Sequence, residues 1–280
     1  MEFLEILKSV LLGIVEGITE WLPVSSTGHM ILFDEIFPLQ VSAEFKELFL
    51  VVIQLGAILA VPTLFFERLN PFSKKKSKEE RSATLSLWGK VIVGAVPAAI
   101  VGLLLDDFFD EHFYNYVVVA AALIVYGILF IVIERIKKDK SFRVERAEDL
   151  SYTDALKIGA YQMLSLIPGT SRSGSTILGG MLSGVSRTAS AEFSFFMAIP
   201  IMLGASCLKI LKFLMEGFSA SGAEIALLLI GIAVSYLVSL VVIKFLMDFV
   251  KNHSFAAFGV YRIALGAVVL GYFLIRSAIA

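Results

Sequence analysis

Residues 16–29, EGITEWLPVSSTGH, place two carboxylates, a proline, two serines, a threonine and a histidine inside an otherwise apolar chain. The chain of 280 residues is 58% hydrophobic and 18% charged, and its mean hydropathy is +0.84. A soluble domain carries roughly a quarter charged residues. Because long apolar runs recur along the whole sequence, we expect a polytopic membrane protein and not a soluble domain with one anchor.

Composition excludes several kinds of function and site. The net charge of −1 gives no indication of nucleic-acid binding. Cys207 is the single cysteine, which excludes an internal disulfide and a metal site built from several cysteines. Glu2 and Glu5 precede Lys8, whereas a signal peptide has a basic start and a small-residue cleavage site. We therefore expect residues 1–22 to belong to the mature protein.

Six apolar segments are long enough to cross a bilayer, which takes about 20 residues. They are residues 45–66, 86–105, 114–133, 189–213, 224–244 and 255–277. Two other stretches, 3–33 and 153–184, are apolar at their ends but are interrupted by polar residues, proline and glycine. The backbone polar groups of such an interruption cannot face lipid, so they must be buried in protein or line a wet cavity.

The distribution of charge predicts the orientation of the spans. Loops 67–90 and 135–157 each carry seven basic residues, whereas residues 106–113, DDFFDEHF, include four acids and neither lysine nor arginine. The positive-inside rule makes the two basic loops cytoplasmic and the acidic segment external. Lys209 and Lys212, near an external end, count mildly against this orientation without reversing it.

The two interrupted stretches resemble each other at a constant offset of 146 residues. The aligned pairs include Gly13 with Gly159, Glu16 with Gln162, Ser25 with Ser171, Thr27 with Ser173, and Gly28 with Gly174. Three spans follow each stretch. If each stretch enters the membrane and returns to the same side, each copy crosses the membrane an odd number of times. The second copy is then inverted relative to the first. The alternative is a chance match of two breaks rich in glycine and serine.

The sequence therefore predicts an all-α polytopic membrane protein that forms a single membrane domain, residues 1–280. Within it we expect an inverted-topology repeat, with residues 1–140 and 141–280 as its two copies. Each copy holds one re-entrant helical hairpin, at 3–33 or 153–184, and three of the six transmembrane helices. Repeats of this kind place binding sites near the midplane of the membrane, where broken helices meet.

Glu16 and Glu20 lie four residues apart, which puts both carboxylates on one face of a helix. A carboxylate in a membrane span costs about 2.5–3.5 kcal/mol on insertion scales, and like charges one turn apart repel. We expect one of the two to be protonated or a cation to lie between them. The alternative is a partly hydrated helix end, since Glu16 is only about four turns from the N-terminus.

Three hydroxyl groups and a histidine follow the proline of this stretch. Ser25, Ser26 and Thr27 suit the start of the hairpin's second half-helix, where a side-chain oxygen caps free amides. Capping accounts for one hydroxyl, and not for three together with His29. Because a helix N-terminus also attracts anions, we expect the cluster to have a chemical role.

The second interruption, PGTSRSGST at residues 168–176, places Arg172 between two serines. An arginine at membrane depth needs an anionic partner, and its planar guanidinium suits phosphate. The alternative is a structural ion pair with Glu16, Glu20 or Glu192. If the two interruptions meet, the carboxylates of Glu16 and Glu20 would repel a bound phosphate unless a divalent metal lay between them. Mg²⁺ is commonly held in this way, by one or two carboxylates plus substrate phosphates. These groups predict a phosphoryl-transfer site whose substrate lies in the bilayer.

Both motifs closely resemble those of the bacterial undecaprenyl-diphosphatase family, the intramembrane type formerly linked to bacitracin resistance. The first family motif, ExxxE followed by PxSSxGH, stands here at residues 16–20 and 23–29, and the second, PGxSRSxxT, at 168–176. Length, spacing and hydropathy are similar over the whole chain. The resemblance implies hydrolysis of undecaprenyl diphosphate to the monophosphate, which recycles the lipid carrier of cell-wall synthesis. It also implies dependence on Mg²⁺ or Ca²⁺, a plasma-membrane location and a site open to the outer face.

On this basis we assign expected roles to the motif residues. Glu16 and Glu20 hold the metal, and one of them acts as a base. Ser26 or His29 attacks the terminal phosphorus or positions the water that does, and Arg172 completes the catalytic set. The expected substrate-binding residues are Ser25, Thr27, Gly169, Thr170, Ser171, Ser173 and Thr176.

The main alternative is a secondary transporter, a class in which inverted repeats and broken helices are common. The glutamates would then carry protons or cations, and Arg172 would bind an anionic solute. A third reading adds movement of the lipid across the bilayer to hydrolysis. The expected partners are undecaprenyl diphosphate and the lipid bilayer, with no nucleic acid, and a homodimer is kept as a candidate assembly.

Overall fold

The computed structural model describes residues 3–138 and 141–279. Within these ranges every element is a helix, apart from one backbone bridge between Val144 and Val185. Six helical segments are long and apolar enough to cross a membrane: Ala43–Leu64, Lys78–Leu105, Tyr116–Lys137, Arg187–Met215, Gly222–Asn252 and Ala256–Ala278. The predicted all-α polytopic protein with six spans is therefore confirmed.

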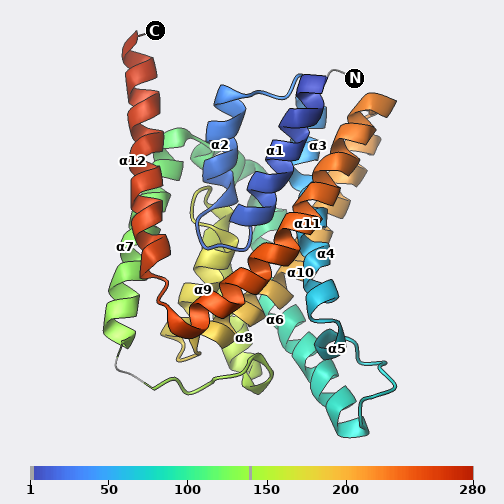
Figure 1. Ribbon diagram of the computed structural model, residues 1–280, viewed down its shortest axis with the longest axis vertical. Helices are drawn as coiled ribbons and strands as arrows, with labels where there is room; N and C mark the ends of the chain where they lie inside the picture. The colour runs from blue at the N-terminus through green and yellow to red at the C-terminus, as the bar shows by residue number, and fades with distance from the viewer. Residues whose placement is uncertain (1–2, 139–140, 280) are drawn as a thin grey trace.

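The spans correspond to labelled helices in Figure 1. The first consists of α3 (Ala43–Val52) and α4 (Gln54–Leu64), and a short helix α5 (Phe66–Leu69) follows it. The others are α6 (Lys78–Phe113), α7 (Tyr116–Lys137), α10 (Arg187–Met215), α11 (Gly222–Asn252) and α12 (Ala256–Ile279). The helix α6 bends at Leu105, where the predicted span 86–105 ends, and the acidic segment 106–113 continues as helix to Phe113.

The two interrupted stretches each form a pair of short helices joined by a turn. The first pair is α1 (Phe3–Thr19) and α2 (Ser26–Ile36). The second is α8 (Tyr152–Gln162), extended by the 3-10 turn η2 (Met163–Leu166), and α9 (Arg172–Leu182). In Figure 1 α1 and α2 occupy the upper part of the molecule and α8 and α9 the lower part, with both turns near mid-height. The inverted repeat and the re-entrant character of the two pairs stay predictions.

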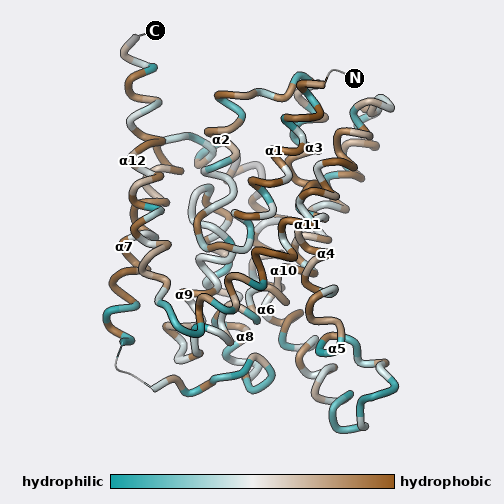
Figure 2. Tube along the Cα trace, in the orientation of Figure 1, coloured by the Kyte–Doolittle hydropathy of each residue, from teal (hydrophilic) through white to brown (hydrophobic). Residues whose placement is uncertain are grey.

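The polar ends of the molecule can be compared with the predicted orientation. The loop after α5 and the segment before α8 both lie at the lower end in Figure 1, opposite the N- and C-terminal ends. Figure 2 shows hydrophilic residues along the loops at that lower end and mainly hydrophobic residues in the helices above it. The two loops predicted to be cytoplasmic therefore share one end. Lys140, which belongs to the second basic loop and ends the predicted first copy of the repeat, lies outside the described residues.

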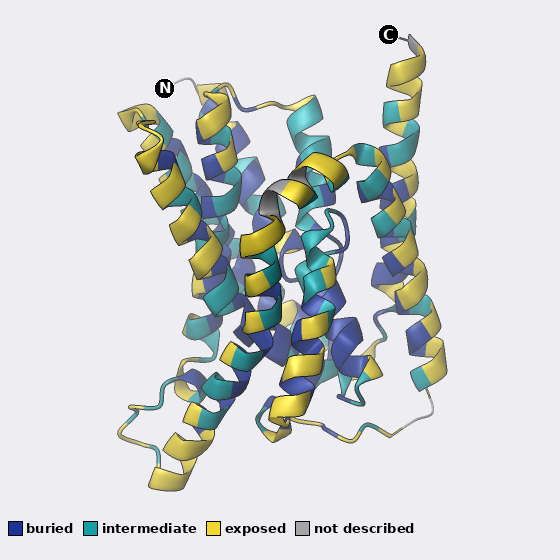
Figure 3. Ribbon diagram, turned by 180° about the vertical axis from the view of Figure 1, so that it is seen from behind, coloured by how far each residue is buried: buried dark blue, intermediate teal, exposed yellow. Residues whose placement is uncertain are grey.

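Glycines allow the helices to pack at short distances, as is usual in membrane proteins. The close pairs include α1 with α11, α4 with α11, α6 with α8 and α7 with α12. A Cβ atom on Gly56 would lie 2.1 Å from the carbonyl oxygen of Ile232, so only glycine fits there. Figure 3 shows that buried residues concentrate on the inward helix faces and exposed ones on the outside, where large apolar side chains such as Leu103 and Val241 suit a lipid surrounding.

Candidate active site

Two turns of the same shape precede α2 and α9. Ser25 has φ 73° and ψ 102°, and Ser171, its partner at the offset of 146, has φ 72° and ψ 127°. Within the described ranges they are the only residues other than glycine with positive φ. Their Oγ atoms accept hydrogen bonds from the amides of Gly28 (3.3 Å) and Gly174 (3.1 Å). A positive φ at such a residue costs about 1–3 kcal/mol and is concentrated at functional sites, so the two turns mark a candidate site.

Local sequence explains why the chain turns at these points. Pro23 has no amide hydrogen with which to continue α1. Gly169 has φ 93°, and a Cβ atom there would lie 2.6 Å from the carbonyl oxygen of Val119. The hydroxyl of Thr170 donates to the carbonyl of Leu164 at 2.9 Å, which closes its own turn. Pro23, Gly169 and the hydrogen bond from Thr170 to the backbone thus fix both turns without a bound ligand.

Glu20 and Arg172 join the two turns through a buried ion pair. Nη2 and Nε of Arg172 donate to Oε1 of Glu20 at 2.8 and 3.2 Å, and the two side chains are only 10% and 9% exposed. Nη1 of Arg172 donates to the carbonyl and hydroxyl oxygens of Ser194 in α10, at 2.8 and 3.1 Å. Of the three carboxylates considered from the sequence, Glu20 is therefore the partner of Arg172. Glu192 instead accepts from Arg68, at 2.7 Å.

Hydroxyl groups of α9 complete this contact. Oγ of Ser173 donates to the carbonyl of Glu20 at 3.1 Å and lies 3.2 Å from Oγ of Ser171. Oγ1 of Thr176 donates to Oγ of Ser194 at 2.7 Å. Ser173 and Thr176 are fully buried. These two hydroxyls are engaged within the protein, where they hold the surroundings of the ion pair.

Ser26 and His29 lie on the first turn of α2. Oγ of Ser26 donates to Oε2 of Glu20 at 3.3 Å. Nδ1 of His29 lies 2.7 Å from the carbonyl oxygen of Ser25, and Nε2 lies 2.7 Å from the hydroxyl of Tyr261 in α12. Because a carbonyl only accepts, the neutral ring carries its hydrogen on Nδ1 and accepts from Tyr261 at Nε2. The hydrogen bonds therefore fix the tautomer and the orientation of His29 together.

Glu16 differs from Glu20 in having a free oxygen. Its side chain is 1% exposed, and Oε1 has no hydrogen-bond partner among the described residues. A buried carboxylate oxygen without a partner is costly unless it binds a proton or a cation. No group of three or more His, Cys, Asp and Glu residues suited to a metal occurs in the part of the chain that is described. Two carboxylates completed by substrate phosphates nevertheless match a common mode of Mg²⁺ binding.

The predicted site residues divide into two groups by exposure. The partly buried residues are Ser26, Thr27, His29, Ser171 and Arg172, the last with 10% of its side chain exposed. The buried residues are Glu16, Glu20, Ser25, Gly169, Thr170, Ser173 and Thr176. The partly buried group offers three hydroxyls, the imidazole and the guanidinium to an incoming ligand, whereas the buried hydroxyls shape the turns that carry them.

Three residues of the site were missed by sequence reasoning: Ser194, Tyr261 and Arg262. Ser194 binds Arg172, Tyr261 binds His29, and Arg262 binds both turns through Pro23 and Gly169. An arginine inside the predicted span 255–277 was a usable signal, because a charge at membrane depth is rare unless it has a function. A serine and a tyrosine in apolar helices carry no comparable signal.

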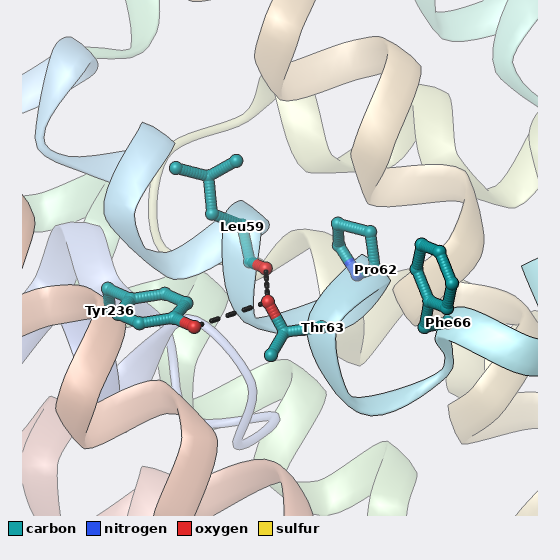
Figure 4. A pocket seen from close by; sticks show the side chains of 5 residues that line it. All are labelled: Leu59, Pro62, Thr63, Phe66 and Tyr236. Atoms are coloured by element: carbon teal, nitrogen blue, oxygen red, sulfur yellow. Dashed lines mark hydrogen bonds between the residues drawn. The ribbon is translucent and has the colours of Figure 1, made fainter.

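An open groove of about 550 Å³ lies at the surface between α4, α5 and α11. Figure 4 shows Thr63 at its centre, where Oγ1 donates to the carbonyl of Leu59 at 2.8 Å and lies 3.3 Å from the hydroxyl of Tyr236. Pro62 and Phe66 complete its lining. None of the predicted site residues lines this groove, so it lies outside the candidate site.

Comparison with known proteins identifies the family. The profile of the family described as "Bacitracin resistance protein BacA" matches residues 9–268. The chain belongs to the BacA family. The matched range contains both turns, the Glu20–Arg172 ion pair and the α12 residues Tyr261 and Arg262.

Curated relatives resemble this BacA-family chain over its whole length. The undecaprenyl-diphosphatase of Desulfitobacterium hafniense is 55% identical, and the alignment covers 100% of both chains. The undecaprenyl-diphosphatase of Enterococcus faecalis is 53% identical, covering 98% of this chain and 99% of the relative. That of Acetivibrio thermocellus is 54% identical, covering 97% and 98%.

Proposed function

We propose that this chain is an undecaprenyl-diphosphatase, which hydrolyses the prenyl diphosphate carrier lipid to the monophosphate and inorganic phosphate. The observation that carries the proposal is the meeting of two capped helix N-termini at the Glu20–Arg172 ion pair. This arrangement combines a cation and free amides for an anion with a hydroxyl next to a carboxylate for chemistry. Relatives that match the chain from end to end carry the same name.

Substrate binding would use the partly buried side of the two turns. Arg172 exchanges Oε1 of Glu20 for diphosphate oxygens, which its planar guanidinium can bind in pairs. Ser171 and Thr27 add hydroxyl donors, and the first amides of α2 and α9 add backbone donors. Ser25, Gly169, Thr170, Ser173 and Thr176 act one layer behind, where they keep the two turns in shape. Supporting this division, Thr170, Ser173 and Thr176 already donate to protein oxygens.

Ser26 is the nucleophile that the geometry favours. Its hydroxyl donates to Oε2 of Glu20, whereas both ring nitrogens of His29 are engaged by other groups. As Oγ of Ser26 bonds to the terminal phosphorus, its proton passes to Glu20. The bond from that phosphorus to the bridging oxygen breaks, and the prenyl monophosphate leaves. Water then attacks the phosphoserine, Glu20 returns its proton to Oγ, and inorganic phosphate is released. His29 positions the turn that carries Ser26, through its hydrogen bonds to the carbonyl of Ser25 and the hydroxyl of Tyr261.

Glu16 and Glu20 would hold a divalent cation, Mg²⁺ or Ca²⁺. Glu16 offers a buried oxygen without a partner, and Glu20 frees Oε1 when Arg172 turns to the substrate. When bound, the cation supplies neutralisation of the charge on the diphosphate, which is a main source of catalysis in phosphoryl transfer. The protein's own contribution is to bury both carboxylates, four residues apart, at the end of α1.

The six apolar helices and the bacterial relatives make the chain a multi-pass protein of the bacterial inner membrane. We propose further that the site opens toward the outer face, because the α1–α2 pair lies in the half of the molecule away from the basic loops. Release of the carrier monophosphate there would serve cell-wall synthesis and counter bacitracin. A homodimer stays a prediction.

Purified protein in detergent, incubated with undecaprenyl diphosphate and Mg²⁺ or Ca²⁺, tests the proposal. We expect release of inorganic phosphate, its loss when EDTA is added, and its return when the metal is restored. The folded fraction of Arg172→Ala, isolated by gel filtration, should release no phosphate. A folded wild-type protein that releases none, with either metal, would contradict the proposal and favour a secondary transporter or lipid flippase built on the same helices.

A further inference from the structure

Arg262 lies behind the two turns and binds both of them. Its side chain is fully buried in α12. Nη1 donates to the carbonyl of Pro23 at 3.1 Å, in the turn before α2. Nη2 donates to the carbonyls of Gly169 (2.8 Å) and Thr170 (3.0 Å), in the turn before α9. One guanidinium thus connects backbone segments that are far apart in the sequence and that carry the two halves of the candidate site.

The charge of Arg262 has no carboxylate partner. No acidic oxygen of the described residues lies within 4.0 Å of its nitrogens, and Nε has no hydrogen-bond partner. The ring of Tyr126 also lies beside it, with its centre 5.4 Å from the guanidinium carbon. Arginine is almost never fully buried unless it is paired. The buried charge of Arg262 is compensated only by backbone carbonyls and an aromatic ring. Its burial therefore indicates a role other than packing.

We propose that Arg262 is a positioning residue that holds the two turns in register and orients their backbone for the diphosphate. The inference rests on the proposed phosphatase function and deepens it. Arg262 is fully buried, so it acts through the backbone and does not touch the substrate. Its uncompensated charge also makes the region behind the two turns attractive to an anion.

Peptide geometry shows how a buried side chain can act at the site. In a planar trans peptide, the N–H points away from the C=O. By fixing the carbonyl of Thr170, Arg262 also directs the amide of Ser171 away from α12, at the start of α9. A Cβ atom on Gly174 would lie 3.3 Å from Nη1, so the first turn of α9 rests directly on the guanidinium. Loss of Arg262 would let this anion-binding backbone move relative to the turn at Pro23.

Two substitutions of Arg262 separate its roles. Arg262→Met keeps much of the length and removes the charge and all the hydrogen bonds, whereas Arg262→Lys keeps the charge and loses the fork that reaches both turns. Arg276→Met is the matched control, because Arg276 lies on the same helix, is half exposed and pairs with Glu35 away from the turns. For each protein, the folded fraction, the melting temperature, kcat, KM and the inhibition constant of inorganic pyrophosphate are measured.

We expect Arg262→Met to lose about 10–100-fold in kcat/KM per folded molecule, the range seen when residues that support a site are removed. The inhibition constant of pyrophosphate should rise in parallel, Arg262→Lys should recover part of both losses, and Arg276→Met should match the wild type. A role in folding alone predicts a different result, in which kcat falls with the folded fraction while KM and the pyrophosphate constant stay unchanged. That result would overturn the proposal, as would failure of both Arg262 variants to fold.

The outcome also separates this inference from the function on which it rests. If the wild type binds pyrophosphate but releases no phosphate from any prenyl diphosphate, the proposed function fails, and the effect of Arg262 on pyrophosphate binding can still be read. If the wild type is active and Arg262→Met is equally active, the proposed function stands and the role of Arg262 is wrong.

Discussion

Ser25 and Ser171 have the same backbone conformation, with φ of 73° and 72°, at positions 146 residues apart. Each caps the helix that follows it by the same hydrogen bond to the third residue on. The shared strain is a structural counterpart of the weak sequence match between the two halves. At these two turns the N-termini of α2 and α9 lie close together. The residues next to the two serines supply the groups that meet there, including Arg172.

Neighbouring serines of the first turn should respond differently to substitution. Ser25→Ala removes the cap of α2 and should destabilise the protein by about 1 kcal/mol. Ser26→Ala removes no cap and should leave the melting temperature unchanged, while kcat falls on the order of 10⁶-fold, as for loss of a nucleophile. Thermal unfolding and phosphate release measured on both variants check this. Substantial turnover by Ser26→Ala would assign the attack to His29 or to water.

The Glu20–Arg172 pair should show strong coupling in stability. Arg172→Met leaves a buried carboxylate without its partner, which typically costs about 3–5 kcal/mol. Glu20→Gln together with Arg172→Met removes both charges and should be less destabilised than Arg172→Met alone. Unfolding of the two single variants and the double variant gives the coupling energy. All three should be inactive, and additive losses of stability would show that the ion pair is not formed.

Tyr261 should act on catalysis through His29. Tyr261→Phe keeps the ring that stacks on the imidazole but removes the hydroxyl that donates to Nε2. We expect kcat to fall by about 10-fold, as for loss of a supporting hydrogen bond. In a His29→Ala background the same substitution should have no further effect. A similar loss in both backgrounds would mean that Tyr261 acts independently of the histidine.

Gly159 should be intolerant of a side chain. A Cβ atom there would lie 2.2 Å from the carbonyl oxygen of Gly94, and backbone atoms cannot yield as a side chain can. Gly159→Ala should therefore separate α8 from α6 and destabilise the protein by about 1–3 kcal/mol. Gly204→Ala is the control, because nothing lies within 4 Å of its Cβ position. Equal melting temperatures for the two variants would contradict this close contact.

The spans could be predicted because a membrane helix needs a long apolar run, and such runs are local features of the sequence. The predicted end of the second span at residue 105 agrees with the bend of α6 at Leu105, but the sequence did not show that the acidic segment continues as helix to Phe113. Polar residues indicate only that a segment has left the apolar layer, and they do not prevent it from remaining helical. The matched glycines 13 and 159 were found by sequence alignment, but their role in helix contacts appeared only from the coordinates.

By itself, the sequence determined the all-α membrane fold, the two interrupted stretches and the motif residues from Glu16 to His29 and from Gly169 to Thr176, because each depends on residue type and short spacing. Only the tertiary structure decided that Arg172 pairs with Glu20, that Tyr261 fixes the ring of His29, and that Arg262 joins both turns. Those contacts bridge separations such as the 239 residues between Arg262 and Pro23. These contacts depend on how the helices pack. The local sequence of an apolar helix does not show which buried group its side chains will contact.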